Sequence, residues 1–256
     1  YIHEKHMGAM GQCIQINWKS CSQIKAKLEF LMSKIAVIPV RSGSKRMPKK
    51  NYRSFNSRNL AEIARDKCLK SGIFDKVVIS SDDPFFAELV NCKEVEFLQR
   101  TEDLADDNAT TDRVVDFFFK QFPTSASILW VNSVSPLQSI EDIKNCGLRL
   151  NDPDVDCVMA VNTLYQHCCI ANKPLNFVPN NPFEKTQDLE PIQRYIYSCM
   201  GWKRETYVEH RSRGFKGLFP GNMALVEAST LAGMLIKYEE DFIFCSKMEE
   251  AMRVIP

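Results

Sequence analysis

The sequence predicts an α/β fold in which a mainly parallel, doubly wound sheet is covered by helices on both faces. Apolar runs with the length of buried strands alternate along the chain with helix-like segments. Polar or charged residues directly follow several of these runs, and ligands of parallel sheets bind at the carboxyl ends of strands. The 256 residues are enough for one large domain with a substantial core.

Six short segments are predicted as strands because they are apolar and rich in residues that favour extended backbone. In chain order they are Lys34–Val40, Lys76–Ser81, Glu94–Leu98, Ser127–Asn132, Asp156–Val161 and Asp241–Phe244.

The predicted helices follow from amphipathic spacing and from capping residues. Gly72 is expected to end the first helix, and Asp83 followed by Pro84 is a typical helix start. Ser246 to Glu249 has the spacing of a capping box for a C-terminal helix. The other predicted helices are those around Leu60–Lys70, Pro84–Asn91, Thr111–Gln121 and Ser139–Leu150.

Residues 162–214 interrupt the alternation because they are rich in proline, asparagine, tyrosine and charge. This composition predicts an excursion from the main sheet. Residues 1–31 are expected to be an extension ahead of a natural start at Met32, without the basic and apolar regions of a secretory signal. A functional arm that packs on the domain is the alternative.

Composition excludes some classes of protein. The formal net charge of +1 argues against a dedicated nucleic-acid or membrane-surface protein, and no apolar run is long enough to span a bilayer. Ten cysteines without a CxxC pair or zinc spacing favour reduced thiols in a cytoplasmic protein. A disulfide framework is the alternative.

A basic loop follows the first predicted strand. Between Arg41 and Asn51 it contains five cations and no acid: Arg41, Lys45, Arg46, Lys49 and Lys50. Gly43 between two serines can turn backbone N–H groups toward one anion. This density of charge fits a triphosphate with its Mg²⁺, and the alternatives are a solvated loop or a patch for an RNA backbone. The spacing matches neither the Walker nor the dinucleotide glycine pattern.

The loop, with the sequence Arg-x-Gly-Ser-Lys-Arg-Met-Pro-x-Lys-Asn, closely resembles the signature of the CMP-sugar-acid synthetases, the acylneuraminate cytidylyltransferases and their relatives. Three further blocks occur in the expected order: Phe74–Asp83, Arg100–Thr111 and Asn132–Gln138. The resemblance covers about residues 33–161 and implies a Rossmann-like sheet of nucleotidyltransferase type. It also implies a domain over residues 32–256 in which residues 162–214 form a dimerisation excursion.

The resemblance implies that CTP is joined to a sialic-acid-like sugar acid with release of pyrophosphate. Arg41 and Lys50 would be catalytic, with Lys50 on the α-phosphate and Asn51 on the ribose. The β- and γ-phosphates would be held by Arg41, Ser42, Gly43, Ser44 and Lys45. The cytosine would be read by Arg100, the Ala109 backbone and Thr111; a surface salt bridge from Arg100 to Glu102 or Asp103 is the alternative.

On the acceptor side, the resemblance implies that Asn132, Ser135 and Pro136 border the sugar acid and that Gln187 contacts it. Asp241 would be the Mg²⁺ ligand. Asp82 and Asp83 are interpreted as capping and fold residues, with metal binding as the alternative. Tyr195, Tyr197, Trp202 and Tyr207 fit either a dimer interface or a core.

Several departures from the family pattern fall on the acceptor and metal side. Asn132 replaces a glutamine, Gln138 and Thr186 replace arginines, and Ile243 stands where a second aspartate is usual. We therefore expect a Mg²⁺-dependent cytidylyltransferase that forms a homodimer and has neither nucleic acid nor membrane as a partner. The alternatives are a non-catalytic nucleotide-binding homologue and, third, nucleotidyl transfer to a sugar phosphate.

Overall fold

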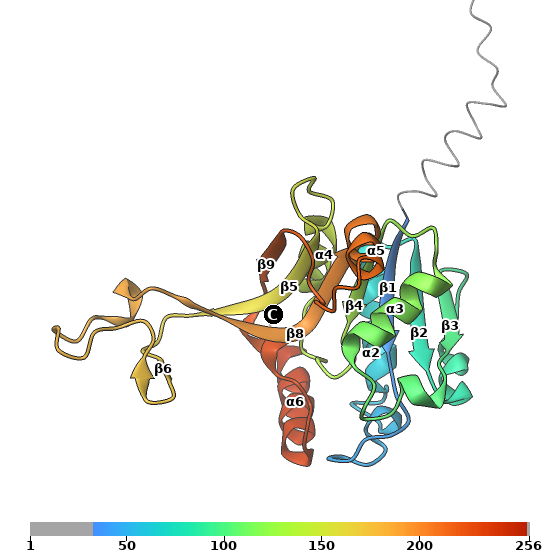
Figure 1. Ribbon diagram of the computed structural model, residues 1–256. Helices are drawn as coiled ribbons and strands as arrows, with labels where there is room; N and C mark the ends of the chain where they lie inside the picture. Colours follow the sequence, from blue (N-terminus) through green and yellow to red (C-terminus); the bar gives the residue numbers. More distant parts are fainter. Residues whose placement is uncertain (1–32, 255–256) are drawn as a thin grey trace, which may run out of the picture.

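The computed structural model describes residues 33–254, and their main sheet has seven strands in the order β3-β2-β1-β4-β8-β5-β9. Neighbouring strands are parallel except β8, which is antiparallel to β4 and β5. This arrangement confirms the predicted mainly parallel α/β sheet (Figure 1). The strands are β1 (Lys34–Pro39), β2 (Lys76–Ser81), β3 (Val95–Gln99), β4 (Ser127–Val131), β5 (Cys157–Leu164), β8 (Ile192–Lys203) and β9 (Met223–Glu227).

Helices cover both faces of the sheet. Buried side chains of α2 and α4, including Cys68 and Ile143, pack on one face, and those of α3 and α5, including Phe118 and Tyr207, on the other. A third cluster forms beneath α6 around Phe242. The helices are α2 (Leu60–Ser71), α3 (Thr111–Gln121), α4 (Ile140–Arg149), α5 (Arg204–Ser212) and α6 (Glu239–Met252). The short 3₁₀ helices are η1 (Lys50–Tyr52), η2 (Pro84–Leu89), η3 (Glu102–Leu104), η4 (Thr186–Asp188) and η5 (Thr230–Gly233).

Most predicted helix boundaries follow from local chemistry. Gly72 ends α2 at φ 68°, a left-handed conformation that glycine adopts without steric cost. Asp83 caps the segment that begins at Pro84, with its side chain accepting the Phe85 N–H. That segment is the 3₁₀ helix η2 instead of the predicted α-helix.

The predicted strand Asp241–Phe244 is wrong, because these residues belong to the first half of α6. Phe242 and Cys245, three residues apart, are buried on one face of the helix, whereas Ile243 and Phe244 are exposed. The predicted capping box at Ser246 is also wrong. Ser246 lies inside α6, where its hydroxyl donates to Asn56 Oδ1.

The predicted excursion of residues 162–214 is only partly correct. Its second half returns to the sheet as β8, whose residues Ser198–Trp202 are buried between β4 and β5. Trp202 and Tyr207 are core residues, whereas Tyr195 and Tyr197 are exposed.

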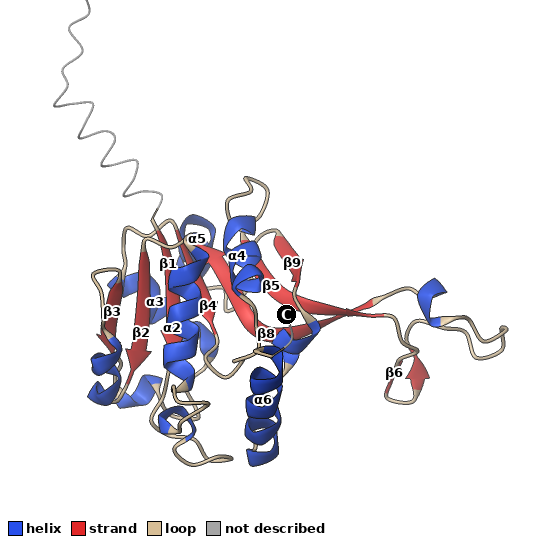
Figure 2. Cartoon of the chain, turned by 180° about the vertical axis from the view of Figure 1, so that it is seen from behind, coloured by secondary structure: helices blue, strands red, loops and turns tan. Residues whose placement is uncertain are grey.

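What leaves the sheet is residues 165–191, which we call the arm; Figures 1 and 2 show it extending away from the sheet. The arm carries a small hairpin of β6 (Cys169–Ile170) and β7 (Lys173–Pro174).

The parallel pairing of β1, β2 and β3 brings their carboxyl ends to one edge. Val40 N–H donates to Ser80 O at 2.8 Å, and Arg100 N–H donates to Ser81 O at 2.7 Å. The segments that begin at Arg41, Asp82 and Arg100 therefore leave the sheet side by side. Within residues 33–254, no helix is both long and apolar enough to cross a membrane. The proposed extension, residues 1–31, lies outside the described residues.

Gly201 provides a test of the packing of β8. A Cβ atom at this position would lie 2.8 Å from Cδ1 of both Leu129 and Leu150. Gly201→Ala is therefore expected to lower the free energy of unfolding by about 1–3 kcal/mol in a denaturant titration. The control is Gly43→Ala, which adds a methyl group with nothing within 4 Å and should leave stability unchanged. Equal stability of the two variants would contradict this packing.

Candidate functional site

A cavity of about 460 Å³ opens at the carboxyl edge of β1 and β4, and we call it the basic cavity. Residues from the loop after β1, from the segment after β3 and from the end of β4 line it together. Among them are ten of the residues assigned a role in the site from the sequence: Arg41, Gly43, Ser44, Lys45, Lys50, Asn51, Arg100, Ala109, Thr111 and Asn132. Three separate segments of the chain thus share one concave surface.

An aspartate that directly follows β2 anchors the start of the basic loop. The Ser42 backbone N–H donates to Asp82 Oδ1 at 2.8 Å, and the Ser42 hydroxyl donates to Asp82 Oδ2. Asn51 closes the far end, because its Nδ2 donates to Arg41 O at 2.9 Å. Ser42 is therefore a support of the loop and does not line the cavity. Asn51 Oδ1 is buried without a hydrogen-bond partner.

Lys50 lies where the loop meets the segment before α6. Its Nζ donates to Ile236 O at 2.9 Å. Burial of the ammonium group, together with the nearby charges of Arg46 and Arg41, lowers the pKa of Lys50 to about 8, although Asp241 opposes the shift. The ammonium group is therefore mostly charged at neutral pH and loses its proton just above it.

Arg100 is buried, with 5% of its surface exposed. Its Nη2 donates to Val40 O at 3.0 Å and its Nη1 to Leu104 O at 3.3 Å, while Nε has no partner. The alternative of a surface salt bridge is therefore wrong; Asp103 pairs with Arg113 instead. Burial lowers the pKa of Arg100 to about 10, and the guanidinium keeps its proton at neutral pH.

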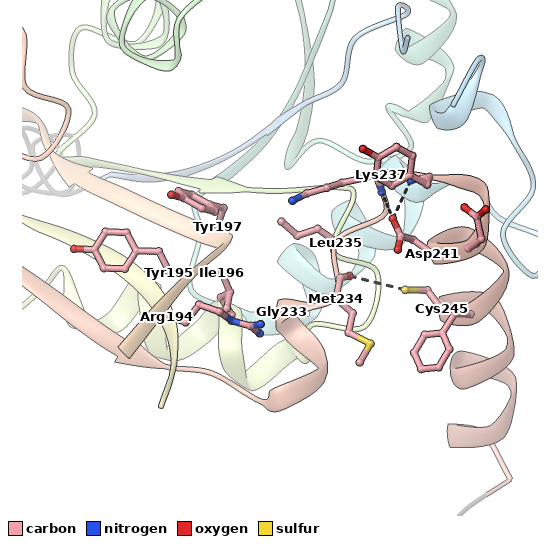
Figure 3. A pocket seen from close by; sticks show the side chains of 13 residues that line it. Arg194, Tyr195, Ile196, Tyr197, Gly233, Met234, Leu235, Lys237, Asp241 and Cys245 are labelled. Atoms are coloured by element: carbon pink, nitrogen blue, oxygen red, sulfur yellow. Dashed lines mark hydrogen bonds between the residues drawn. The ribbon is translucent and has the colours of Figure 1, made fainter. Parts of the chain in front are cut away.

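A second cavity of about 540 Å³ lies between β8 and the start of α6, and we call it the β8–α6 cavity (Figure 3). It combines charges of both signs with apolar side chains. Arg194 and Lys237 contribute positive charge, and Glu240 and Asp241 contribute negative charge. The apolar surface comes from Met234, Leu235 and Phe244. Arg194 Nη2 also donates to Asn162 Oδ1 at 3.1 Å.

Asp241 lines this second cavity and caps α6. Its Oδ2 accepts the N–H groups of Lys237 and Tyr238, each at 2.8 Å (Figure 3). Within residues 33–254, no three His, Cys, Asp or Glu side chains group as ligands for a metal ion. The carboxylate of Asp82 accepts a hydrogen bond from the Ser42 hydroxyl, and that of Asp83 accepts from the Tyr52 hydroxyl and the Phe85 N–H. Both therefore act as capping and fold residues.

Three residues singled out on the acceptor side lie away from both cavities. Ser135 is buried and its hydroxyl donates to Ala232 O at 2.6 Å, so it ties the loop after β4 to η5. Pro136 also supports this loop, because its carbonyl oxygen accepts a hydrogen bond from Lys67 Nζ at 2.6 Å. Gln187 lies in η4 on the exposed arm.

The sequence reasoning missed Asp107, Trp130, Arg194 and Lys237, which line one or the other cavity. Asp107 could have been identified, since it lies inside the block Arg100–Thr111. Arg194 and Lys237 carried no sequence signal.

The family described as cytidylyltransferase matches residues 35–190. A pseudaminic acid cytidylyltransferase of Campylobacter jejuni is 29% identical over 88% of each chain. An N-acylneuraminate cytidylyltransferase of Streptococcus agalactiae is 24% identical over 71% of this chain, and the matched part is 46% of that relative's length.

Among solved structures, the chain resembles a CMP:2-keto-3-deoxy-manno-octonic acid synthetase complexed with CTP. The TM-score is 0.60, and the likeness covers 86% of this chain and 99% of the other. At 12% sequence identity it shows a shared fold.

Asp82→Asn tests how the basic loop is held. The amide cannot accept the Ser42 N–H and hydroxyl with two charged oxygens, so exchange of the Ser42 amide hydrogen should accelerate by about tenfold or more. The control is Asp83→Asn, next in sequence, whose carboxylate accepts from Tyr52 and Phe85. Unchanged exchange at Ser42 in Asp82→Asn would show that this anchor does not hold the loop.

Proposed function

The chain belongs to the cytidylyltransferase family, and from this premise we propose that it transfers the cytidylyl group of CTP to a sialic-acid-like sugar acid. The observation that carries the proposal is the basic cavity, in which Lys50 and the basic loop face the segment from Arg100 to Thr111. One end offers cations for a triphosphate, and the other offers polar groups for a pyrimidine.

Each group in the basic cavity has a proposed task. Arg41, Lys45 and the N–H groups around Gly43 bind the β- and γ-phosphates, and Lys50 binds the α-phosphate. Asn51 accepts from the ribose through its unpaired Oδ1. Arg100, the Ala109 backbone and Thr111 bind the cytosine, for which Arg100 Nε is an unpaired donor.

The β8–α6 cavity is the proposed acceptor site. Lys50 lines the basic cavity and hydrogen-bonds to Ile236, one residue before Lys237 of the β8–α6 cavity. An acceptor carboxylate would bind Arg194 and Lys237 there. The acceptor hydroxyl oxygen forms a bond to the α-phosphorus and loses its proton to solvent. The bond from that phosphorus to the β-phosphate breaks, and pyrophosphate leaves with the electron pair.

Asn132 lies between the two proposed sites. It lines the basic cavity, and its Nδ2 donates to Tyr197 O in β8 at 3.4 Å. Asn132 is therefore proposed to contact the acceptor. Ser135 acts through the backbone of its loop, and Gln187 could contact an acceptor only from the arm.

Asp241 is the residue proposed to hold a Mg²⁺ ion that arrives with the nucleotide; it lines the β8–α6 cavity, and its charge acts on Lys50 of the basic cavity. Mg²⁺ in nucleotide sites is commonly held by one or two carboxylates together with phosphate oxygens. Asp241 would supply the carboxylate, since its Oδ1 is free of the hydrogen bonds that occupy Oδ2. When bound, the ion would neutralise phosphate charge.

A homodimer in the cytoplasm is the proposed working form. The arm exposes apolar side chains that a second copy would cover, among them Ile170, Val178 and Phe183, the last with 79% of its surface exposed. The eight cysteines within residues 33–254 are free thiols, which suits a reducing compartment.

A non-catalytic nucleotide-binding homologue is the second candidate. The observation in its favour is that Asp241 lacks the neighbouring acid of the family pattern, since Ile243 stands at that position.

One assay separates the two candidates. The protein is incubated with CTP, Mg²⁺ and a panel of keto sugar acids, and pyrophosphate release is measured, with ATP in place of CTP as the control. Release with CTP and at least one acid is expected. Binding of CTP without release across the panel would favour the second candidate.

If the protein is an enzyme, Lys50→Ala should lower the turnover number more than it weakens CTP binding.

The pKa of Lys50 predicts how CTP binding depends on pH. In the free protein this side chain loses its proton near pH 8, whereas a bound triphosphate favours the charged form. Above pH 8, binding must therefore take up a proton, and affinity should fall about tenfold between pH 7 and pH 9. Calorimetric titration measures this. Lys50→Arg keeps its charge and should show a much flatter profile; the same profile in both proteins would exclude Lys50 as the titrating group.

A further inference from the structure

Asp107 presents a carboxylate to the cations of the basic loop. Its Oδ1 accepts from Arg41 Nη1 at 2.8 Å, and its Oδ2 lies 2.5 Å from Lys45 Nζ. Each carboxylate oxygen thus pairs with one cation, and all three side chains line the basic cavity. The two cations assigned to the β- and γ-phosphates are already paired within the chain.

The neighbouring residue holds this carboxylate in place. Asp106 Oδ1 accepts the N–H groups of Asn108 at 2.8 Å and of Ala109 at 2.7 Å, which fixes the turn that carries Asp107. Ala109 belongs to the cytosine end of the proposed site. Asp107 therefore connects the phosphate end of the cavity to the segment that would read the base.

The chemistry of this contact matches that of a phosphate. A carboxylate and a terminal phosphate group both offer negatively charged oxygens to the same guanidinium and ammonium groups. Hydrogen bonds from Lys45 and Arg41 lower the pKa of Asp107, so the carboxylate is charged at neutral pH. The pairs remain displaceable, since exposed side-chain fractions are 38% for Arg41, 82% for Lys45 and 37% for Asp107.

We propose that Asp107 is a specificity-determining residue that occupies the β- and γ-phosphate position when no nucleotide is bound. This inference rests on the proposed function for the placement of the phosphates. A ligand with a pyrophosphate group displaces Asp107 from both cations. A ligand that ends at the α-phosphate leaves the contact intact.

The consequence is that Asp107 lowers the affinity for CTP and for pyrophosphate and leaves the affinity for the CMP-sugar unchanged. CTP carries the group that competes with Asp107, whereas the CMP-sugar has lost it as pyrophosphate. Once pyrophosphate has left, Asp107 pairs again with Arg41 and Lys45. The contact therefore opposes rebinding of pyrophosphate and lowers its affinity for the free protein.

Asp107→Asn tests the proposal. Inorganic pyrophosphate, CTP and CMP are titrated separately by calorimetry into the wild-type and variant proteins, in the presence of a chelator. The variant should bind pyrophosphate and CTP about three- to tenfold more tightly, the effect expected when two exposed ion pairs no longer compete. The affinity for CMP should change by less than about twofold.

Glu102→Gln is the matched control, because it removes the same charge from an exposed residue of the same segment that has no ion pair among the described residues. Unchanged or weaker binding of pyrophosphate to Asp107→Asn would overturn the proposal. So would an equal gain for CMP, or the same gain in Glu102→Gln, because either would indicate a general effect of charge.

A parallel titration of CTP with Mg²⁺ excludes a metal-ligand role. The proposal predicts tighter binding to Asp107→Asn there too, and weaker binding only with Mg²⁺ would make Asp107 a metal ligand and overturn it. Failure of the proposed function would be seen in the wild-type protein itself. That protein would then bind neither CTP nor pyrophosphate, or would release no pyrophosphate with any acid.

Discussion

The parallel pairing of β1 with β2 and β4 is the interaction on which the proposed site depends. β1 is buried at Ile35–Ile38 and hydrogen-bonded along both edges. Because side chains alternate between the faces of a strand, a slip of one residue would place the apolar residues of β1 on the wrong faces. The register therefore fixes where the chain leaves the sheet at Arg41, beside the end of β2 and next to the end of β4.

Acids and a backbone carbonyl at this edge hold the loop that carries the five cations. Asp82 accepts from the start of the loop, Asp107 pairs with two of its side chains, and a backbone carbonyl accepts from Lys50. Charges held by such partners are preorganised for an anion, because little ordering is left to occur on binding. Asp107 is the partner that a phosphate would displace, so its two ion pairs and the affinity for a phosphate oppose each other.

Much of the fold could be predicted from the sequence because local signals agreed with the tertiary structure. β2 and α3 have the predicted bounds. The apolar run of β2 is typical of a buried strand, and the amphipathic spacing of α3 is typical of a helix. The predicted strand at Asp241–Phe244 was wrong because a run of three apolar residues does not distinguish a strand from a helix. β8 was missed because its first half is exposed and polar, and its burial depends on neighbours distant in the chain.

In the candidate site, the residues of the basic cavity could be predicted from the sequence, whereas those on the acceptor side could not. The residues of the basic cavity form contiguous blocks that directly follow strands, so motif and topology indicated them together. Asp107 was overlooked within such a block because an ion pair across 66 residues has no sequence signal of its own. On the acceptor side, Arg194 and Lys237 come from separate segments, and Gln187 is placed by the arm and not by the sheet.

The most direct test of the central claim is a crystal structure of the full chain with CTP. We expect the triphosphate between the N–H groups around Gly43 and Lys50, and the cytosine between Arg100 and Thr111. A nucleotide bound elsewhere, or bound with its base at the loop after β1 and its phosphates at Thr111, would contradict it.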